Sequence, residues 1–237
     1  MAIDLLATAP HYVDHLRPIW DALPASARRH FYLGPKAQRD GIVGARRVDT
    51  LARDGDVPIV TVAHGDFKLA RAAHRSRIAL GQHGAGQSYS SQHASYPGGR
   101  DQDEVDLFLV PNGHAARRTL EAYPNTRCEI VGCPKLDALP RKRHRETGQP
   151  VIAVSFHFDT TVAPETRSAW SFYRAHVAAL ARTFKVIGHA HPRIVGQLGT
   201  WYRSNRIEVV SSLEDVFRRA DIYVCDNSSS LFECEEV

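Results

Sequence analysis

Short apolar runs alternate with amphipathic segments along most of this chain. Runs rich in β-branched residues, such as 58–63 and 151–156, are typical of buried strands. Between the runs, segments such as 12–23 and 164–183 carry apolar side chains at helical spacing. Strands that alternate with helices predict parallel sheets with right-handed crossovers. We therefore expect an α/β protein.

The segment 139–150, LPRKRHRETGQP, interrupts this alternation and is typical of a linker because it is basic and proline-bounded. We expect one Rossmann-like unit over 1–138 and a second, short one over 151–237, with a cleft between them. The RKRHR run is compatible with nucleic-acid contact, but a charge run in a linker is more often simply solvated. Nucleic-acid binding would also need more basic surface and interleaved aromatic residues, so we do not expect a nucleic-acid partner.

Polar clusters follow two predicted strands in the second unit. In an open α/β sheet, ligands bind at the carboxyl ends of the strands. One cluster also begins a helix, where free backbone N–H groups and hydroxyls suit a phosphate. The sequence therefore predicts that this unit holds a nucleotide diphosphate, through His189, His191, Arg193, Asp226, Ser228 and Ser229.

In the first unit, His83 follows the predicted strand 77–80 and stands in a glycine-rich loop. A histidine near its ordinary pKa can take a proton from an attacking hydroxyl. Gly84 would let the backbone approach a ligand closely, and we expect it to contact the nucleotide donor. The alternative is a loop histidine bonded only to the backbone. His64, which also follows a strand, is a weaker candidate of the same type.

Composition limits which ligands, metals and cofactors we expect. The 237 residues carry a net charge of +4, which agrees with an anionic ligand without requiring nucleic acid. The four cysteines form no CxxC pair, so we expect buried thiols in a reducing compartment. We find no metal-binding motif and no Walker A loop, so we expect neither a metal nor a cofactor. The first residues lack a signal peptide and no apolar run is long enough to span a membrane, so we expect a cytoplasmic protein.

Four stretches together resemble the CDP-glycerol glycerophosphotransferase family, which includes the teichoic-acid polymerases. More broadly, the chain looks like the GT-B glycosyltransferases and the UDP-N-acetylglucosamine 2-epimerases of the same fold. The stretches are Gln82-His83-Gly84, the G-x-P-x-x-D pattern from Gly132 to Asp137, His191-Pro192, and the region from Leu213 through Asp226-Asn227-Ser228-Ser229 to Glu233.

The resemblance implies a metal-independent transferase that moves a sugar or a polyol phosphate from a nucleotide-activated donor to a hydroxyl of a glycan, polymer or protein. The N-terminal unit would face the acceptor, with His83 as the base. The C-terminal unit would bind the donor diphosphate through His191, Ser228 and Ser229, assisted by Arg193. Two alternatives stay open: an epimerase, for which we find no convincing cluster of carboxylates, and a non-catalytic module that binds a nucleotide or glycan.

Overall fold

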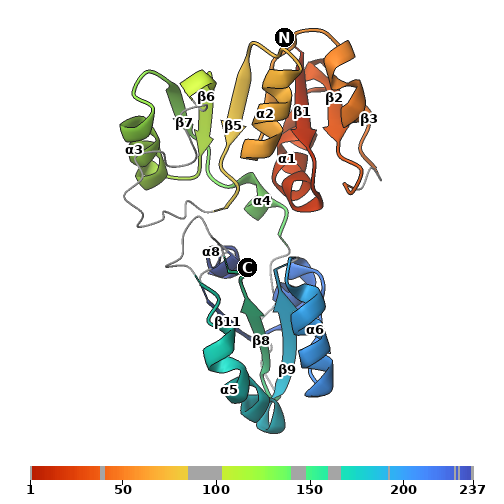
Figure 1. The fold of residues 1–237 in the computed structure, drawn as a ribbon, viewed down its shortest axis with the longest axis vertical. Helices are drawn as coiled ribbons and strands as arrows, with labels where there is room; N and C mark the ends of the chain where they lie inside the picture. Colours follow the sequence, from red (N-terminus) through yellow and green to blue (C-terminus); the bar gives the residue numbers. More distant parts are fainter. Residues whose placement is uncertain are drawn as a thin grey trace. The chain divides into compact units, whose positions relative to one another are not determined.

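The computed structural model describes residues 2–37, 41–84, 103–139, 148–159, 167–191, 193–226, 228 and 230–235. Contacts between Cα atoms divide the chain into two compact units, with the boundary between Ala138 and Leu139. We call the N-terminal part unit 1 and the C-terminal part unit 2. Each unit contains a parallel sheet with helices beside it (Figure 1), so the predicted α/β class with two parallel sheets is confirmed.

In unit 1, the described residues form a seven-stranded sheet in the order β3-β2-β1-β4-β5-β6-β7. Each neighbouring pair of strands is parallel. The strands are β1 (Ile3–Ala7), β2 (Arg28–Leu33), β3 (Ala45–Arg47), β4 (Ile59–Thr61), β5 (Ile78–Gly81), β6 (Leu107–Val110) and β7 (Arg127–Ile130). The helices are α1 (Pro10–Ala22), α2 (His64–Ala72), α3 (Gly113–Ala122) and the short α4 (Pro134–Asp137), and the 3₁₀ turns are η1 (Ala25–Ala27) and η2 (Val48–Arg53).

Helices cover both faces of this sheet because successive strand side chains point in opposite directions. On β1, Leu5 joins a cluster with Leu16 and Trp20 of α1. Its neighbour Leu6 joins the opposite cluster, which contains Phe67 of α2. Burial on both faces explains why central strands such as β4 read as apolar runs.

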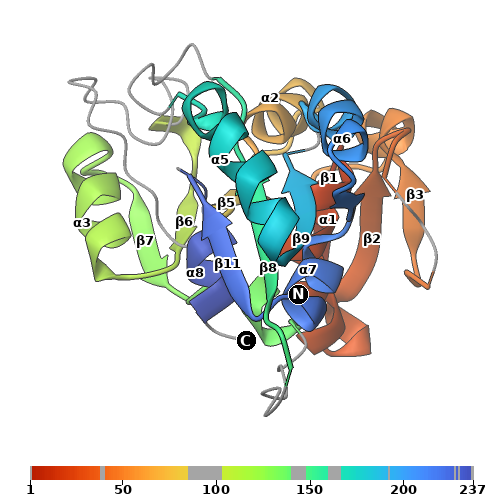
Figure 2. The same cartoon turned by 90° about the horizontal axis from the view of Figure 1, so that it is seen from below.

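In unit 2, the described residues form a four-stranded parallel sheet in the order β10-β9-β8-β11. The strands are β8 (Val151–Phe156), β9 (Lys185–Ala190), β10 (Glu208–Val209) and β11 (Ile222–Cys225), and the helices are α5 (Trp170–Thr183), α6 (Val195–Ser204), α7 (Leu213–Arg219) and α8 (Ser230–Glu235). Figure 2 shows α5 and α6 on one face of the sheet, with α7 and α8 on the other.

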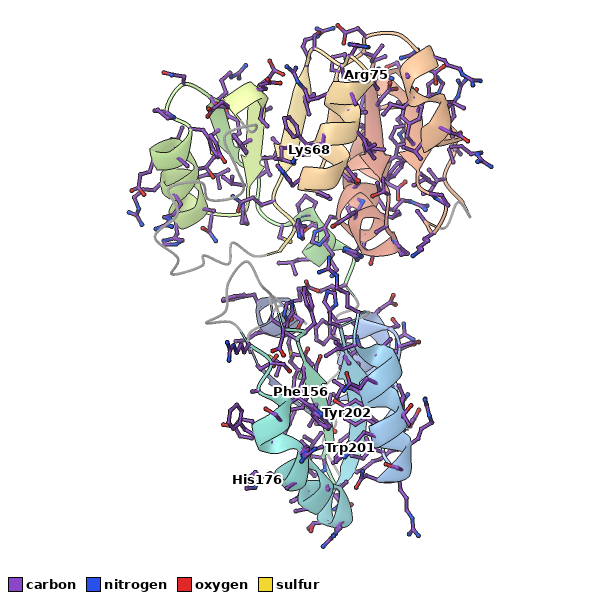
Figure 3. The ribbon with its side chains drawn as sticks, in the orientation of Figure 1. Lys68, Arg75, Phe156, His176, Trp201 and Tyr202 are labelled. Atoms are coloured by element: carbon purple, nitrogen blue, oxygen red, sulfur yellow. The ribbon has the colours of Figure 1, made fainter. Side chains whose placement is uncertain are left out.

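Aromatic side chains fill the space between α5, α6 and the sheet of unit 2. The Trp170 ring lies 5.1 Å from the Phe156 ring and 4.5 Å from the Trp201 ring, measured between centroids. Figure 3 shows Phe156, Trp201 and Tyr202 gathered there. A β-carbon added at Gly188 of β9 would lie 2.6 Å from the Tyr202 ring, so only glycine lets α6 pack this closely.

Several boundaries differ from the sequence-based expectation. Strand β9 continues through Gly188 and His189 to Ala190, where we expected a polar cluster, because Gly188 belongs to the α6 contact. Residues 167–169 are not helical, although we expected a helix there. The edge strand β3 was not predicted, since Arg46 and Arg47 are polar and exposed. The cysteines are free thiols, but they are half-buried and not buried.

No helix in the described ranges is both long enough and apolar enough to cross a membrane.

Candidate functional site

The strand order reverses beside the first strand of each unit. In unit 1 this happens between β1 and β4, and in unit 2 between β8 and β11. Loops on the two sides of such a point turn in opposite directions, which leaves a crevice at the carboxyl ends of the strands where ligands bind in open α/β sheets. These two points are therefore the first places to look for chemistry.

At the first of these points, hydrogen bonds join the loop that follows β1 to the first turn of α2. The buried Asp66 of α2 accepts hydrogen bonds from the Thr8 backbone N–H, at 3.0 Å, and from the Thr8 hydroxyl. Burial raises the pKa of Asp66, while the two bonds from Thr8 act to lower it. Asp66 therefore ties the start of α2 to the loop after β1, and both of its carboxylate oxygens accept hydrogen bonds from Thr8.

His83 follows β5 and reaches this same region. Its Nδ1 lies 2.7 Å from the backbone carbonyl oxygen of Val62, which follows β4. Since a carbonyl only accepts, Nδ1 must carry the proton of the bond. In the neutral ring the lone pair is then on Nε2, so the backbone selects the tautomer in which Nε2 is the basic atom.

The surroundings of His83 favour the neutral ring. The ring centroid lies 5.4 Å from that of Tyr12 and 6.2 Å from that of His15, both on α1. Crowding by protein atoms is the largest cause that lowers the pKa of His83; the bond to Val62 opposes it, and the Lys135 charge adds to it. Because His83 is nevertheless exposed, solvent limits the first effect. A lowered pKa of His83 suits a base that must be neutral to act.

Gly84, which we expected to contact the donor, is buried with a φ of 115°. This is the left-handed half of the backbone map, which side-chain-bearing residues rarely adopt. The backbone conformation itself thus explains the glycine, and its donor contact stays a prediction. His64, the weaker candidate, begins α2 and stacks on Phe67, with 6.3 Å between the ring centroids.

His15 makes the stability of unit 1 depend on pH. It is buried, and burial, followed by Lys135, His83 and His11, lowers its pKa to about 2. Below about pH 6.5 the unfolded chain binds a proton at this site that the folded chain does not. Stability that is present above pH 6.5 is therefore lost as the pH falls, by about 1.4 kcal/mol per pH unit.

Hydrogen exchange of unit 1 peptides in urea, between pH 7 and pH 4.5, measures this loss. The His15→Gln variant should lack the added slope because glutamine does not titrate. A matched control is His114→Gln on the exposed surface of α3, which should keep the slope of the unsubstituted protein. Equal slopes in all three proteins would contradict the assignment to His15.

In unit 2, Asp226 joins loops across the strand-order reversal. Its Oδ1 accepts from the backbone N–H of His157 at 2.8 Å, and its Oδ2 accepts from that of Ala169 at 3.0 Å. His157 follows β8 and Ala169 precedes α5. Both carboxylate oxygens are thus engaged by backbone N–H groups, which holds the loop after β8 and the start of α5 in place. The expected donor contact of Asp226 stays a prediction.

His191 follows β9 and packs against the segment after β8. Its ring centroid lies 4.5 Å from that of Phe158 and 5.1 Å from that of His157. Its Nδ1 accepts the Arg193 backbone N–H at 3.2 Å. An accepting Nδ1 has no proton, so the neutral ring carries its proton on Nε2 and can donate it. This tautomer is the opposite of that of His83.

Arg193 provides a fixed positive charge beside His191. Its guanidinium carbon lies 4.5 Å from the centroid of the Phe158 ring, a distance typical of a cation–π contact. The side chain is exposed, so its N–H groups remain accessible to an anion. The structure thus brings together His191 and Arg193, which we predicted, with His157 and Phe158, which we did not select although they too follow a strand.

Two further residues that we predicted to bind the donor, His189 and Ser228, are hydrogen-bonded to other side chains of unit 2. His189 belongs to β9, where its Nδ1 is 2.8 Å from the Ser155 hydroxyl oxygen and its carbonyl accepts from the Tyr202 hydroxyl at 3.1 Å. Ser228 lies in the turn before α8 and accepts at Oγ from the Ser230 hydroxyl at 2.7 Å. Ser229 lies outside the described residues, so its expected place beside His191 stays a prediction. Within the described ranges, no three His, Cys, Asp or Glu side chains form a group that could hold a metal ion.

Comparison with known proteins gives a result at the level of the fold. No family model matches the sequence, and no curated protein matches it. The solved structure of UDP-N-acetylglucosamine 2-epimerase from Rickettsia bellii is similar, with a TM-score of 0.58 at 12% identity, covering 98% of this chain and 75% of that one.

Two further solved structures agree with the first. A variant of the wall teichoic acid polymerase TagF matches with a TM-score of 0.61 at 13% identity, over 99% of this chain and 68% of that one. UDP-GlcNAc 2-epimerase from Methanocaldococcus jannaschii matches with a TM-score of 0.57 at 12% identity, over 100% of this chain and 81% of that one. Since identities this low show a shared fold and not a shared reaction, the conclusion is that this chain has the GT-B-type fold of these structures.

Proposed function

We propose that the protein is a metal-independent transferase that moves a sugar or a polyol phosphate from a nucleotide-activated donor to an acceptor hydroxyl. The observation that carries the proposal is the pair of opposite histidine tautomers. In the neutral rings, His83 of unit 1 carries its lone pair on Nε2, and His191 of unit 2 carries its proton on Nε2. A transfer to a hydroxyl needs one group that removes a proton and another that binds the charge of the leaving phosphate.

The donor diphosphate would bind in unit 2. The His191 Nε2–H and the guanidinium of Arg193 would donate to phosphate oxygens, and Ser228 would add a hydroxyl from the turn before α8. Charge-assisted bonds of this kind are about twice as strong as neutral ones. The Phe158 ring holds the Arg193 guanidinium, so less side-chain freedom is lost when the anion binds.

The acceptor hydroxyl would give its proton to Nε2 of His83 as its oxygen attacks. In sugar transfer, a carbon–oxygen bond forms at the sugar and a nucleoside diphosphate leaves. In polyol phosphate transfer, the new bond is to phosphorus and a nucleoside monophosphate leaves. In both cases the leaving phosphate takes the electron pair of the broken bond, so cationic and N–H donors in unit 2 assist departure.

An epimerase is the second candidate, because the similar solved structures include two UDP-N-acetylglucosamine 2-epimerases. That reaction needs a nucleotide sugar but no acceptor. Incubating the protein with a nucleotide sugar alone distinguishes the two: a change of configuration at the sugar supports the epimerase, and product that forms only when an acceptor is added supports the transferase.

A thermal-shift panel of CDP, UDP, GDP and ADP conjugates tests the donor site itself. A ligand that binds only the folded state raises the melting temperature by mass action, by an amount that grows with its concentration. We expect one nucleotide class to raise it. If no conjugate in the panel does so at millimolar concentration, the proposed donor site is wrong.

Replacing Arg193 with alanine should weaken the binding of that nucleotide by roughly 10- to 100-fold, the range for a hydrogen bond to a charged group. Arg174 on α5 provides the matched control, since it is an exposed arginine of the same unit, and Arg174→Ala should leave affinity unchanged. Titration calorimetry on both variants makes the comparison. Equal affinities in Arg193→Ala and Arg174→Ala would remove Arg193 from the site.

A further inference from the structure

A chain of hydrogen-bonded side chains runs across the sheet of unit 2. The Ser155 hydroxyl on β8 lies 2.8 Å from Nδ1 of His189 on β9, and it is also hydrogen-bonded to the hydroxyl of Tyr223 on β11. The Tyr223 hydroxyl lies 2.7 Å from that of Ser230, which donates to Ser228 at 2.7 Å. Figure 1 shows the adjacent strands β9, β8 and β11 that carry its first three members.

The direction of these bonds is set at the Ser228 end. The Ser228 Oγ accepts twice, from the Ser230 hydroxyl at 2.7 Å and from the Ser230 backbone N–H at 3.3 Å. Because the Ser230 hydroxyl donates its one proton to Ser228, its oxygen can only accept in the bond with Tyr223. With both inner contacts of Ser228 accepting, its own hydroxyl proton is left to point elsewhere.

We propose that Tyr223 is a positioning residue, which orients the Ser228 hydroxyl as a donor to an anionic oxygen of the nucleotide ligand. This inference rests on the proposed function, because it takes Ser228 as part of the donor site. Tyr223 occupies the oxygen of Ser230 as a donor. Without it, Ser230 would offer a vacant acceptor, and the Ser228 hydroxyl could turn inward to donate to Ser230 in competition with the ligand.

Tyr223 is suited to this role by its surroundings. Its ring packs edge-on against Phe217 of α7, with 5.5 Å between centroids, which fixes the hydroxyl between Ser155 and Ser230. Burial raises the pKa of Tyr223 more than its hydrogen bonds with Ser155 and Ser230 lower it. The net rise keeps the phenol protonated, so it can accept from Ser155 and donate to Ser230 at the same time.

The Tyr223→Phe variant tests the inference because it keeps the ring and removes only the hydroxyl. The matched control is Tyr202→Phe, which loses another hydroxyl, bonded to the His189 carbonyl, outside this chain of side chains. Calorimetry with CDP, UDP, GDP, ADP and inorganic pyrophosphate gives affinities, and thermal melts compare stability. For the probe that binds the unsubstituted protein, we expect about a 3- to 10-fold loss in Tyr223→Phe, typical of one neutral hydrogen bond, and none in Tyr202→Phe.

A double-mutant cycle separates positioning from mere structural support. If Tyr223 acts through Ser228, the phenylalanine substitution should cost no further affinity in a Ser228→Ala background, because interacting residues are not additive. Additive losses, an unchanged affinity in Tyr223→Phe, or equal losses in both tyrosine variants would each overturn this inference and leave the proposed function standing. If none of the five probes binds the unsubstituted protein, the proposed function falls together with it.

Discussion

Replacing His83 with alanine is expected to slow turnover by roughly 10²–10⁴-fold, the usual contribution of a positioned general base. The acceptor hydroxyl is a poor nucleophile near neutral pH, and the Nε2 lone pair of His83 is the group that would take its proton. Donor affinity should stay nearly unchanged, because the proposed donor contacts are His191, Arg193 and Ser228 in unit 2. Turnover and donor affinity measured on the same variant test both halves of this expectation.

The His83→Gln variant distinguishes a general base from a residue that only holds its loop through the bond to the Val62 carbonyl. Glutamine can still donate to the Val62 carbonyl, as His83 does, but its amide cannot accept a proton at neutral pH. We expect this variant to be almost as slow as the alanine variant, with a melting temperature close to that of the unsubstituted protein. Substantial activity in His83→Gln, or a large drop in melting temperature with recovered activity, would end the general-base assignment.

Two further measurements sharpen this test. The control variant is His64→Gln, since His64 also follows a strand in unit 1 but is not proposed to act, and it should retain activity. The pH profile gives an independent check. Because the pKa of His83 is lowered from 6.5, the acid limb of the rate profile should have its midpoint below that value. A midpoint above 6.5 would contradict the environment that we describe.

The sequence was sufficient for the fold class because the central strands of the two parallel sheets, such as β4 and β8, are buried on both faces. Runs such as 151–156 carry that signal in full, and β8 matches this run residue for residue. Elements without an apolar pattern escaped prediction. β3 is an exposed, arginine-containing edge strand, and α4 is a single turn. The length of β9 depends on Gly188 meeting the Tyr202 ring, a contact that no local pattern reveals.

The candidate site could be located from the sequence but not interpreted from it. Polar residues after strands identified His83, His191 and Arg193. Their chemistry depends on which nitrogen of each ring is bonded, and those bonds reach Val62 in one case and a backbone N–H in the other. Tyr223 was missed because a tyrosine inside an apolar strand reads as a core residue, and its role depends on serines from two other elements.

The largest expected loss of stability follows from replacing Arg75 with methionine. Arg75 and Asp4 are both fully buried in unit 1, and the Arg75 guanidinium lies 3.0 Å from the Asp4 carboxylate. Removing one partner of a buried ion pair typically costs about 3–5 kcal/mol, and here it leaves the Asp4 carboxylate with the half-buried Arg29, 3.2 Å away, as its remaining ion-pair partner. Figure 3 labels Arg75 near the C-terminal end of α2, and the same guanidinium also donates to the carbonyl oxygens of Val57 and Leu51, at 3.1 and 3.3 Å.

The loss should depend on pH through Asp4. Burial raises the pKa of this carboxyl more than Arg75, Arg29 and His30 lower it, and removing Arg75 raises it further. Because the folded state then holds a proton that the unfolded state releases, stability is present at low pH and is lost as the pH rises through this window. We therefore expect Arg75→Met to be more destabilising at pH 8 than at pH 5, as measured by hydrogen exchange of unit 1 peptides in urea.

A second substitution shows whether the buried Asp4 charge is the cause. Asp4→Asn keeps an oxygen that can accept the His30 backbone N–H, now 3.1 Å away, and removes the carboxylate charge. In the Arg75→Met background it should restore part of the lost stability and abolish the added pH dependence, because no buried charge remains unpaired. The pair between the exposed Arg46 and the half-buried Asp54, at 3.0 Å, supplies the control, and Arg46→Met should cost at most about 1 kcal/mol. If Arg75→Met costs no more than Arg46→Met, or if Asp4→Asn makes the Arg75→Met protein less stable still, the buried pair does not have the role assigned to it.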